Sequence, residues 1–388
     1  FAARPALAAP CAMARRPTLA MAPRRAAAVV LSLHAAAASS AVASSAPALP
    51  LGHPFPGKAY PPRPGFTLWL VEEFTKPLDL DTDPIWTWSD GGLSEGQVRF
   101  VKEAVRFEKG KMQIVASRGF QPASCSNAEV GIVEDKPVGS GEVRTRHNMF
   151  RYGYYEVRMR APRVRPNDTD TNGNYVSTMF VYRDAKFRHW REIDVEVTGD
   201  SSRSVTMNVL NADGTTVWNP TIQASQHFVA PSWANLRGRF HRYGFEWLPT
   251  GITWYLDGEI VGHHSPEHLL KIPDLSAKIV MNLWVFREEW GYAFGGREGK
   301  NNAYPMYSEY DWLRFYKWDG DAQYPCEGAS TSCLTEDDRF FSSNNPCDGI
   351  PQEGGVPPCV AECAREKSPQ ELGADSSASQ READIFFP

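Results

Sequence analysis

Three acidic side chains recur at alternate positions in the segment His189–Gly199, as Glu192, Asp194 and Glu196. The residues between and after them are β-branched and apolar, so the segment alternates with a period of two. This period is typical of a half-buried β-strand, in which one face packs in a core and the other stays polar. The segment therefore predicts a strand that presents three carboxylates in a row on one face.

Such a row is unfavourable for folding, because neighbouring anions repel one another and raise each other's pKa. Two carboxylates that flank a bond, one ionised and one protonated, can cleave a glycosidic linkage, and a third acid between them can keep them different. A solvated strand face and a cation site are the alternatives, since acids are common on surfaces.

Geometry limits the catalytic interpretation. On a regular strand the Cα atoms of Glu192 and Glu196 lie about 13 Å apart. Retaining cleavage needs carboxyl groups about 5–5.5 Å apart, and inverting cleavage needs roughly 6.5–9.5 Å. Two long Glu side chains that lean toward the shorter Asp194 would close much of this gap, and strand curvature would help.

The composition is that of a globular protein with a mild negative charge. The chain has 388 residues, of which 42% are hydrophobic and 22% charged, and its formal net charge is −5. A protein that binds nucleic acid is expected to carry a basic face, which this charge argues against. The 12 Trp, 14 Tyr and 20 Phe residues suit the binding of sugar rings, although the same side chains also fill cores.

The start of the chain predicts export. We expect residues 1–43 to be a leader with a secretory signal peptide that begins near Met21, where two arginines precede an Ala-rich apolar stretch and a small-residue cleavage site. A transit peptide is the alternative, because the leader lacks acidic residues. The apolar stretch is too short for a membrane span. Residues 44–63 are rich in Pro and predict a linker.

The end of the chain is rich in cysteine. Six cysteines remain after removal of the leader, and an even number fits disulfides in an oxidising compartment; they are Cys125, Cys326, Cys333, Cys347, Cys359 and Cys363. We expect residues 321–366 to form a Cys-rich extension, with zinc as a weaker alternative because no His cluster lies nearby. Residues 367–388 are polar and predict a disordered tail.

The middle of the chain predicts many short strands separated by turn residues. An Asp-Gly pair at Asp257 and Gly258 between two apolar runs predicts a hairpin. Short strands with turn signals between them are typical of a β-sandwich or barrel. The candidate strands are Thr67–Glu72, Val105–Glu108, Lys111–Ala116, Glu142–Thr145, Tyr154–Arg160, Tyr175–Tyr182, Glu192–Thr198, Ser204–Leu210, Arg242–Trp247, Gly251–Leu256, Lys278–Val285 and Tyr310–Trp318.

The motif EIDVE at residues 192–196 resembles the active-site strand of glycoside hydrolase family sixteen. Flanking segments are similar to landmarks of that family and occur in the same order: LVEEF (70–74), SGEVRT (140–145), YGYYEVR (152–158), YGFEW (243–247), YLDG (255–258), NLW (282–284) and DWLRFY (311–316). The resemblance covers roughly residues 64–320, which we expect to form the catalytic domain.

The resemblance implies an all-β fold, a jelly-roll sandwich of two curved antiparallel sheets of the concanavalin A-like type, with a glycan cleft on the concave face. It also implies a retaining mechanism with Glu192 as nucleophile, Glu196 as general acid/base and Asp194 assisting between them. Nearby negative charge would raise the pKa of Glu196 and keep its proton near neutral pH. When a glycosyl-enzyme forms on Glu192 that charge disappears, so Glu196 would then become the base.

The spacing also resembles one part of the family. Many members insert a residue before the second Glu, which bulges the strand, whereas the unbulged form is similar to lichenases, plant xyloglucan-modifying enzymes and fungal cell-wall transglycosylases. Further residues match cleft positions of the lichenase-like group and could stack on sugars or bond their hydroxyls, with ordinary packing as the alternative. These expected substrate-binding residues are Arg144, Trp190, Asn208, Asn282 and Trp284.

Two residues depart from the lichenase pattern. Leu210 stands where some lichenases have a Tyr, which weakens the assignment to their mixed-linkage substrate. Arg191 stands before the nucleophile where a small or acidic residue is common, and its charge could help to keep Glu192 ionised.

We expect a secreted retaining endo-β-glucanase, located outside the cell or in a cell wall, that hydrolyses β-1,3/β-1,4-linked glucan. A transglycosylase on the same scaffold is the alternative, because the two reactions differ only in whether water or a sugar hydroxyl resolves the covalent intermediate. A lectin-like glycan binder is a further alternative, but a binder does not need three crowded acids.

We expect no cofactor and no metal in the site. Calcium held by Asp194 and Glu196 is disfavoured because both are needed for the chemistry, while a structural calcium ion elsewhere on the sandwich stays open. The expected partner is a β-glucan polysaccharide or oligosaccharide, with no nucleic acid and no membrane, and the expected state is a monomer.

Overall fold

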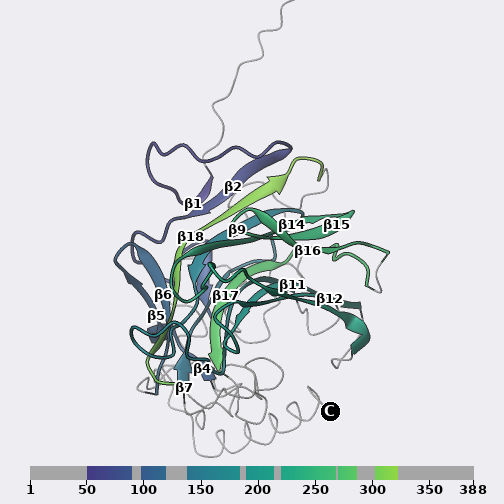
Figure 1. The fold of residues 1–388 in the computed structure, drawn as a ribbon. Coiled ribbons are helices and arrows are strands. Elements are labelled where there is room, and N and C mark those ends of the chain that lie inside the picture. The colour runs from purple at the N-terminus through teal and green to yellow at the C-terminus, as the bar shows by residue number, and fades with distance from the viewer. Residues whose placement is uncertain are drawn as a thin grey trace, which may run out of the picture. The chain divides into compact units, whose positions relative to one another are not determined.

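Two β-sheets stacked face to face form the part of the chain described by the computed structural model (Figure 1). The described residues are 50–89, 98–118, 138–183, 189–213, 220–267, 270–285 and 302–321. Neighbouring strands are antiparallel except for two parallel pairs, β1 with β2 and β4 with β7. The structure therefore confirms an all-β sandwich, while the predicted leader, all the cysteines and the predicted disordered tail lie outside the described residues.

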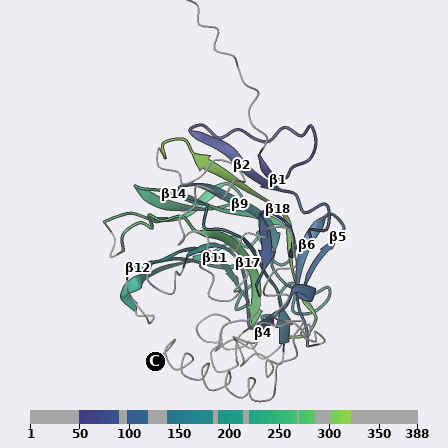
Figure 2. The same cartoon turned by 180° about the vertical axis from the view of Figure 1, so that it is seen from behind.

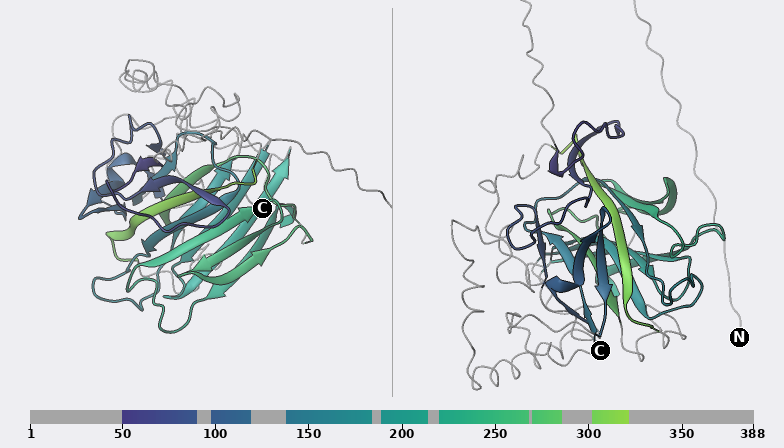
Figure 3. Two further views of the ribbon diagram at one scale, coloured as in Figure 1. Left: turned by 90° about the horizontal axis from the view of Figure 1, so that it is seen from above. Right: turned by 90° about the vertical axis from the view of Figure 1, so that its left-hand side faces the viewer.

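The larger sheet has nine strands. Its main path runs β1 (Leu51–His53), β2 (Phe66–Glu72), β18 (Met306–Trp318), β9 (Gly153–Arg160), β14 (His241–Leu248), β15 (Gly251–Leu256) and β16 (Glu259–His264), and β5 (Val105–Glu108) joins through β6 (Lys111–Ala116) to β18. The long strand β18 crosses this layer beside both β2 and β9, as Figure 3 shows in yellow-green.

The smaller sheet has seven strands and contains the acidic segment. Its order is β13 (Gln223–Val229), β12 (Ser204–Asp213), β11 (His189–Thr198), β10 (Tyr175–Arg183), β17 (Lys278–Val285), β8 (Glu142–Thr145) and β3 (Trp86–Trp88). Strands β11, β12 and β17 lie together in this layer when the molecule is seen from behind (Figure 2). A separate pair, β4 (Val98–Phe100) and β7 (Val138–Ser140), and two short 3-10 helices, η1 (Lys102–Ala104) and η5 (Pro220–Ile222), complete the described elements.

Every strand predicted from the sequence is present. The predicted hairpin is confirmed as the turn between β15 and β16, where Asp257 and Gly258 have φ of 53° and 95°. A two-residue hairpin turn of this type needs positive φ at both positions, which an Asp-Gly pair tolerates. The strands that the sequence did not predict are short or polar: β1, β3, β4, β7 and β13.

The core lies between the sheets and is rich in aromatic residues. On the larger sheet Tyr155 stacks on Phe245 with ring centroids 4.7 Å apart, and Trp247 beside them is fully buried. From the smaller sheet β11 contributes Ile193 and Val195, both at most 2% exposed. Alternate residues of β11 therefore pack inward, as the period of two predicts.

One hydrogen bond joins the larger sheet directly to the acidic strand. The indole Nε1 of Trp254, on β15, donates to the backbone oxygen of Asp194 at 2.9 Å. Trp254 is only 1% exposed, so this bond lies in the core. It helps to fix the distance between β11 and the larger sheet.

The second half of the predicted linker over residues 44–63 makes specific contacts with the sandwich. Strand β1 pairs with β2, and Lys58 Nζ donates to both carboxylate oxygens of Glu73 at 2.9 and 3.0 Å. The guanidinium of Arg63 lies 3.7 Å from the ring centroid of Tyr154 and bonds to Glu246. The high Pro content makes this run irregular, but its cations and aromatic rings have partners on the larger sheet.

Within the described ranges, no helix is long and apolar enough to cross a membrane.

Replacement of Trp254 by Phe tests the tie between the sheets. The variant keeps an aromatic ring but loses the bond to Asp194 and leaves a small void, so we expect the free energy of unfolding to fall by about 2 kcal/mol. Urea unfolding measures it. Trp233→Phe is the control, because Trp233 is 62% exposed and should change stability by less than about 0.5 kcal/mol. An unchanged stability for Trp254→Phe would contradict the role of this bond.

Candidate active site

The three acidic residues lie on one face of β11, as the alternation predicts. On the neighbouring strand β10, their cross-strand partners are Tyr182 for Glu192, Phe180 for Asp194 and Thr178 for Glu196. Strand β11 is bonded on both sides, to β10 and to β12, so its backbone is held by two ladders. The carboxylates thus project from the interior of a sheet, on the face turned away from the core.

The three carboxyl groups differ in exposure. Asp194 is 4% and Glu196 7% exposed, whereas Glu192 is half-buried. Burial, followed by the charges of Glu192 and Glu196, holds the pKa of Asp194 well above its usual range. Burial also raises the pKa of Glu196 to about 7. We expected neighbouring charge to be the main cause at Glu196, but removal from water comes first because the side chain is almost fully covered.

Glu192 receives two hydrogen-bond donors. The indole Nε1 of Trp190, two residues earlier on the same face, donates to Glu192 Oε2 at 2.6 Å. Asp194 shares a hydrogen bond with Glu192 that favours the protonated form of Asp194. A carboxyl group that bonds to a carboxylate must itself carry the proton. This hydrogen bond therefore favours Asp194 as the donor to Glu192.

Glu196 has a different partner. The amide Nδ2 of Asn208, on β12, donates to Glu196 Oε2 at 2.6 Å. This bond acts against burial and lowers the pKa of Glu196. The structure thus brings two of the predicted substrate-binding residues, Trp190 and Asn208, into direct contact with the two outer carboxyl groups.

The other predicted substrate-binding residues occupy the same sheet face but are farther from β11. Asn282 and Trp284 are on β17, two strands away, and Arg144 is on β8, three strands away. Neighbouring strands are separated by about 4.8 Å, so Arg144 is on the order of 14 Å from β11. Asn282 and Arg144 are buried and Trp284 is half-buried.

A hydrogen-bonded row that the sequence did not single out connects these strands. Thr178 Oγ1 donates to Asn282 Oδ1 at 2.5 Å, and Asn282 Nδ2 donates to Glu142 Oε2 at 2.8 Å. Ser89 donates to the other oxygen of Glu142. Glu142 shares parity with Arg144 on the same short strand, which is the signal that could have identified it.

Apolar residues gather beside Glu192. Trp190, Leu210 and Ile222 form a small cluster that is separate from the main core, with Tyr182 packed against it. Leu210 stands opposite Glu192 in the register of β11 and β12. The residue that departs from the lichenase pattern therefore contributes apolar surface next to the expected nucleophile.

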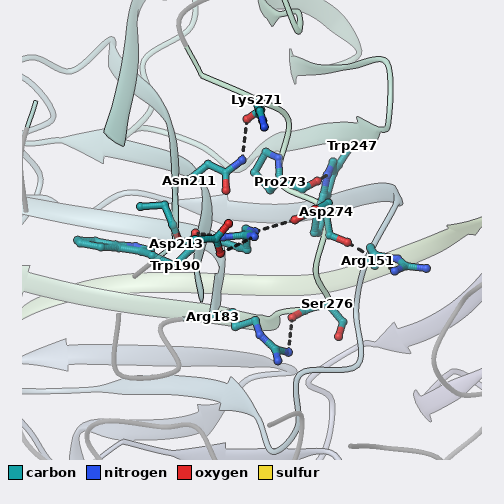
Figure 4. A network of polar contacts seen from close by, with 12 residues as sticks. Arg151, Arg183, Trp190, Asn211, Asp213, Trp247, Lys271, Pro273, Asp274 and Ser276 are labelled. Carbon is teal, nitrogen blue, oxygen red and sulfur yellow. Dashed lines mark hydrogen bonds and ion pairs between the residues drawn. The ribbon is translucent and has the colours of Figure 1, made fainter. Parts of the chain in front are cut away.

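Arg191 points away from the carboxylate face. Its Nε donates to Asp274 at 2.8 Å and its Nη2 to Asp213 at 3.0 Å, while Nη1 bonds to the backbone oxygens of Trp190 and Ala212 (Figure 4). Its side chain is only 5% exposed. The positive charge is thus balanced by two other carboxylates, and the donors described for Glu192 are Trp190 and Asp194.

The same network holds residues 271–276, which lead into β17. Asn211 Nδ2 donates to the backbone oxygen of Lys271 at 2.9 Å, and Trp247 Nε1 donates to that of Pro273 at 2.8 Å. Figure 4 shows this segment between side chains from both sheets. The end of β11 that carries Trp190 and Glu192 is therefore fixed by contacts outside the site.

Among the described residues no group of three or more His, Cys, Asp or Glu side chains is arranged to hold a metal ion. The expectations about cofactors and calcium stay predictions.

Replacement of Glu196 by Gln tests the effect of burial. A carboxyl group whose pKa is about 7 when folded and 4.5 ordinarily binds a proton more tightly in the folded protein. It therefore destabilises the fold as pH rises from about 4.5 to 7. The Gln variant lacks this titration, so its stability relative to the wild type should rise across that interval, by about 1.4 kcal/mol for each pH unit.

Urea unfolding at pH 4.5 and pH 8 measures the difference. Glu259→Gln is the matched control, because Glu259 is exposed on β16. Equal pH dependence of the wild type and Glu196→Gln would show that the Glu196 carboxyl group has an ordinary pKa in the folded protein.

The central part of the chain is similar to known proteins. Residues 98–312 match the model of the family described as glycosyl hydrolases family 16. A beta-glucanase of Acetivibrio thermocellus is 30% identical over 215 residues, which cover 55% of this chain and 52% of that protein. A beta-glucanase of Bacillus amyloliquefaciens is 33% identical over 172 residues, with 43% and 60% covered. The chain thus spans about half the length of the Acetivibrio relative.

The fold is also shared with a solved structure, the catalytic domain of an endo-1,3-beta-glucanase (laminarinase) from Thermotoga petrophila. It has a TM-score of 0.51 and 18% identity, and the match covers 65% of this chain and 98% of that one. The family match covers more than half of the chain and includes the strand with the three carboxylates. This chain belongs to glycosyl hydrolase family 16.

Proposed function

We propose that this protein is a secreted retaining endo-β-glucanase that cleaves β-1,3/β-1,4-linked glucan. The observation that carries the proposal is the difference between two Glu side chains on one sheet face. Glu192 accepts donors from Trp190 and Asp194, while burial raises the pKa of Glu196 to about 7. Near neutral pH, one is suited to attack and the other to donate a proton.

The reaction follows from these states. In the first step the Glu192 carboxylate attacks the anomeric carbon, the glycosidic C–O bond breaks, and the proton of Glu196 passes to the departing oxygen. In the second step Glu196 takes a proton from water, whose oxygen replaces Glu192 on the same carbon. Two inversions give net retention.

Asp194 assists by carrying a proton. While Glu192 is an anion, Asp194 donates to it and limits the repulsion between the acids. When Glu192 becomes an ester its charge is lost, and the negative field at the other two carboxyl groups weakens. The loss favours ionisation of Glu196, which then acts as base.

The proposed substrate-binding residues extend away from the acids across the sheet, on strands from β12 to β8. Trp190 and Trp284 offer faces for sugar rings, and Arg144, Asn208 and Asn282 offer donors for hydroxyls. A polymer laid across the strands would contact several of these residues at once, which favours cleavage within a chain. The relatives from Acetivibrio and Bacillus, which are beta-glucanases, support β-glucan as the substrate.

The remaining parts of the proposal come from the sequence. The predicted leader over residues 1–43 supports export to the cell exterior or a cell wall, and the six later cysteines would fit disulfides there. We further propose a monomer without a cofactor, which binds neither nucleic acid nor membranes.

The assignment is tested with lichenan, laminarin and xyloglucan, by following new reducing ends. We expect the wild type to release them from at least one glucan, with the β-anomer formed first in NMR spectra. Glu192→Gln should lower kcat by at least about a thousand-fold while glucan binding persists, whereas Glu259→Gln should match the wild type.

Three results would contradict the proposal. A folded wild type that cleaves no β-glucan overturns the activity, and the α-anomer as first product overturns retention. If the products are mainly oligosaccharides longer than the starting chains, the protein is a transglycosylase and not a hydrolase.

A further inference from the structure

Asn208 lies between Glu196 and two polar side chains of β13. Its Nδ2 donates to Glu196, while its Oδ1 accepts from Gln223 Nε2 at 3.2 Å and from the Ser225 hydroxyl. Gln223 Nε2 also donates to Ser225 Oγ at 2.9 Å. Ser225 stands directly opposite Asn208 in the register of β12 and β13. The side chains of Gln223, Ser225, Asn208 and Glu196 thus form one hydrogen-bond network, which ends on the expected acid/base Glu196.

The hydrogen bonds from β13 set the orientation of the Asn208 amide. An Asn amide has a donor NH2 group and an acceptor oxygen of nearly equal size, so it could otherwise bind in either of two orientations. Two donors from β13 meet the Oδ1 of Asn208, so its Nδ2 must face Glu196. Without them, the reversed amide would present an oxygen to Glu196, and only a protonated Glu196 could bond to it.

We propose that Ser225 and Gln223 are positioning residues that act through Asn208 on Glu196. They keep its proton on Oε1, let the carboxyl group give that proton up in the first step, and leave it able to act as base in the second. The proposal rests on the proposed function. Oε2 accepts the amide hydrogen of Asn208, so Oε1 remains as the oxygen that exchanges a proton with the departing sugar and with water.

The surroundings of Glu196 contain few other groups that could set its proton affinity. On its own strand, Asp194 and Glu192 are the nearby titratable groups. On the neighbouring strand β10, the residue opposite Glu196 is the neutral Thr178. Across β12 it faces Thr206, whose partner on β13 is the exposed His227. Farther along the face are the neutral Asn282 and the acidic Glu142 on β17 and β8, with Arg144 beside Glu142.

Asn208 is the neighbour whose hydrogen bond lowers the pKa of Glu196. Reversal of its amide would remove this effect and add an acceptor that favours the protonated form. The pKa of Glu196 should then rise further. The second step, which needs Glu196 as base, should slow at neutral pH. Asn208 also bonds to Asp194 and lowers its pKa, so the pKa of Asp194 should rise as well, while Glu192 keeps its bond from Trp190.

Ser225 and Gln223 suit substitution because they lie outside the core. Strand β13 is at the edge of its sheet, Ser225 is exposed and Gln223 is half-buried. Gln226 is a matched control on the same strand. It pairs with Met207, on the opposite face from Asn208, and donates to the backbone oxygen of His263 at 2.6 Å.

The test is the pH dependence of kcat/KM on the best β-glucan. In the double variant Ser225→Ala with Gln223→Leu, we expect the alkaline limb to move up by about 0.5–1 pH unit and kcat at neutral pH to fall. Ser225→Thr keeps the hydroxyl and should leave the limb near its wild-type position, as should Gln226→Ala.

A second readout does not need turnover. Glu196→Gln gains stability relative to its parent over a pH interval whose lower end is set by the unfolded chain and whose upper end is set by the folded protein. When the parent carries the double substitution, the upper end should move upward by the same amount and the lower end should stay. A wild type with a bell-shaped profile and a double variant with an unmoved limb would overturn this inference alone. A wild type that cleaves no β-glucan would overturn it together with the proposed function.

Discussion

The properties of the site depend on the burial of two carboxyl groups, which project from the middle of a β-sheet and are largely removed from water. Asp194 and Glu196 are each less than 10% exposed, and burial is the first cause of the raised pKa of both. Burying an ionised carboxylate is costly, so such groups hold protons instead. The third acid, Glu192, is less buried and has donors around it. Three carboxyl groups on one strand thereby acquire different affinities for a proton.

The fold supplies the rigidity that this difference requires. Strand β11 is bonded on both edges, and its inner face packs against aromatic residues of the other sheet. Trp254 bonds to its backbone from across the core, and Arg191 ties its first half to residues 213 and 274. A shift of β11 would change the contacts of all three acids together, so these distant ties help to define the site.

The sequence predicted the fold and the acidic face well, because both follow from local periodicity. Alternation placed Glu192, Asp194 and Glu196 opposite Ile193, Val195 and Val197, and the register confirms that placement. An Asp-Gly pair was enough to predict the hairpin after β15. The resemblance to the family supplied the roles and the five other residues, of which Trp190 and Asn208 contact the acids directly.

What the sequence did not predict depends on partners that are distant along the chain. Strand β13 is polar on the face that meets Asn208, so Gln223 and Ser225 gave no apolar alternation. Residues 50–63 have the composition of a linker, yet Lys58 bonds to Glu73, directly after β2, and Arg63 bonds to Glu246 on β14. Arg191 was expected to act on Glu192, but parity turns it to the other face, where Asp213 and Asp274 bind it.

The central claim is that the three neighbouring acids hold different protonation states at neutral pH. It is measured most directly by carbon-13 NMR titration of the labelled side-chain carboxyl groups, with Asp194→Asn and Glu196→Gln variants to assign the signals. We predict a Glu196 signal with a midpoint near pH 7 and an Asp194 signal with a midpoint well above the usual range of an aspartate. Titration of all three groups near their ordinary values of about 4 would contradict the account.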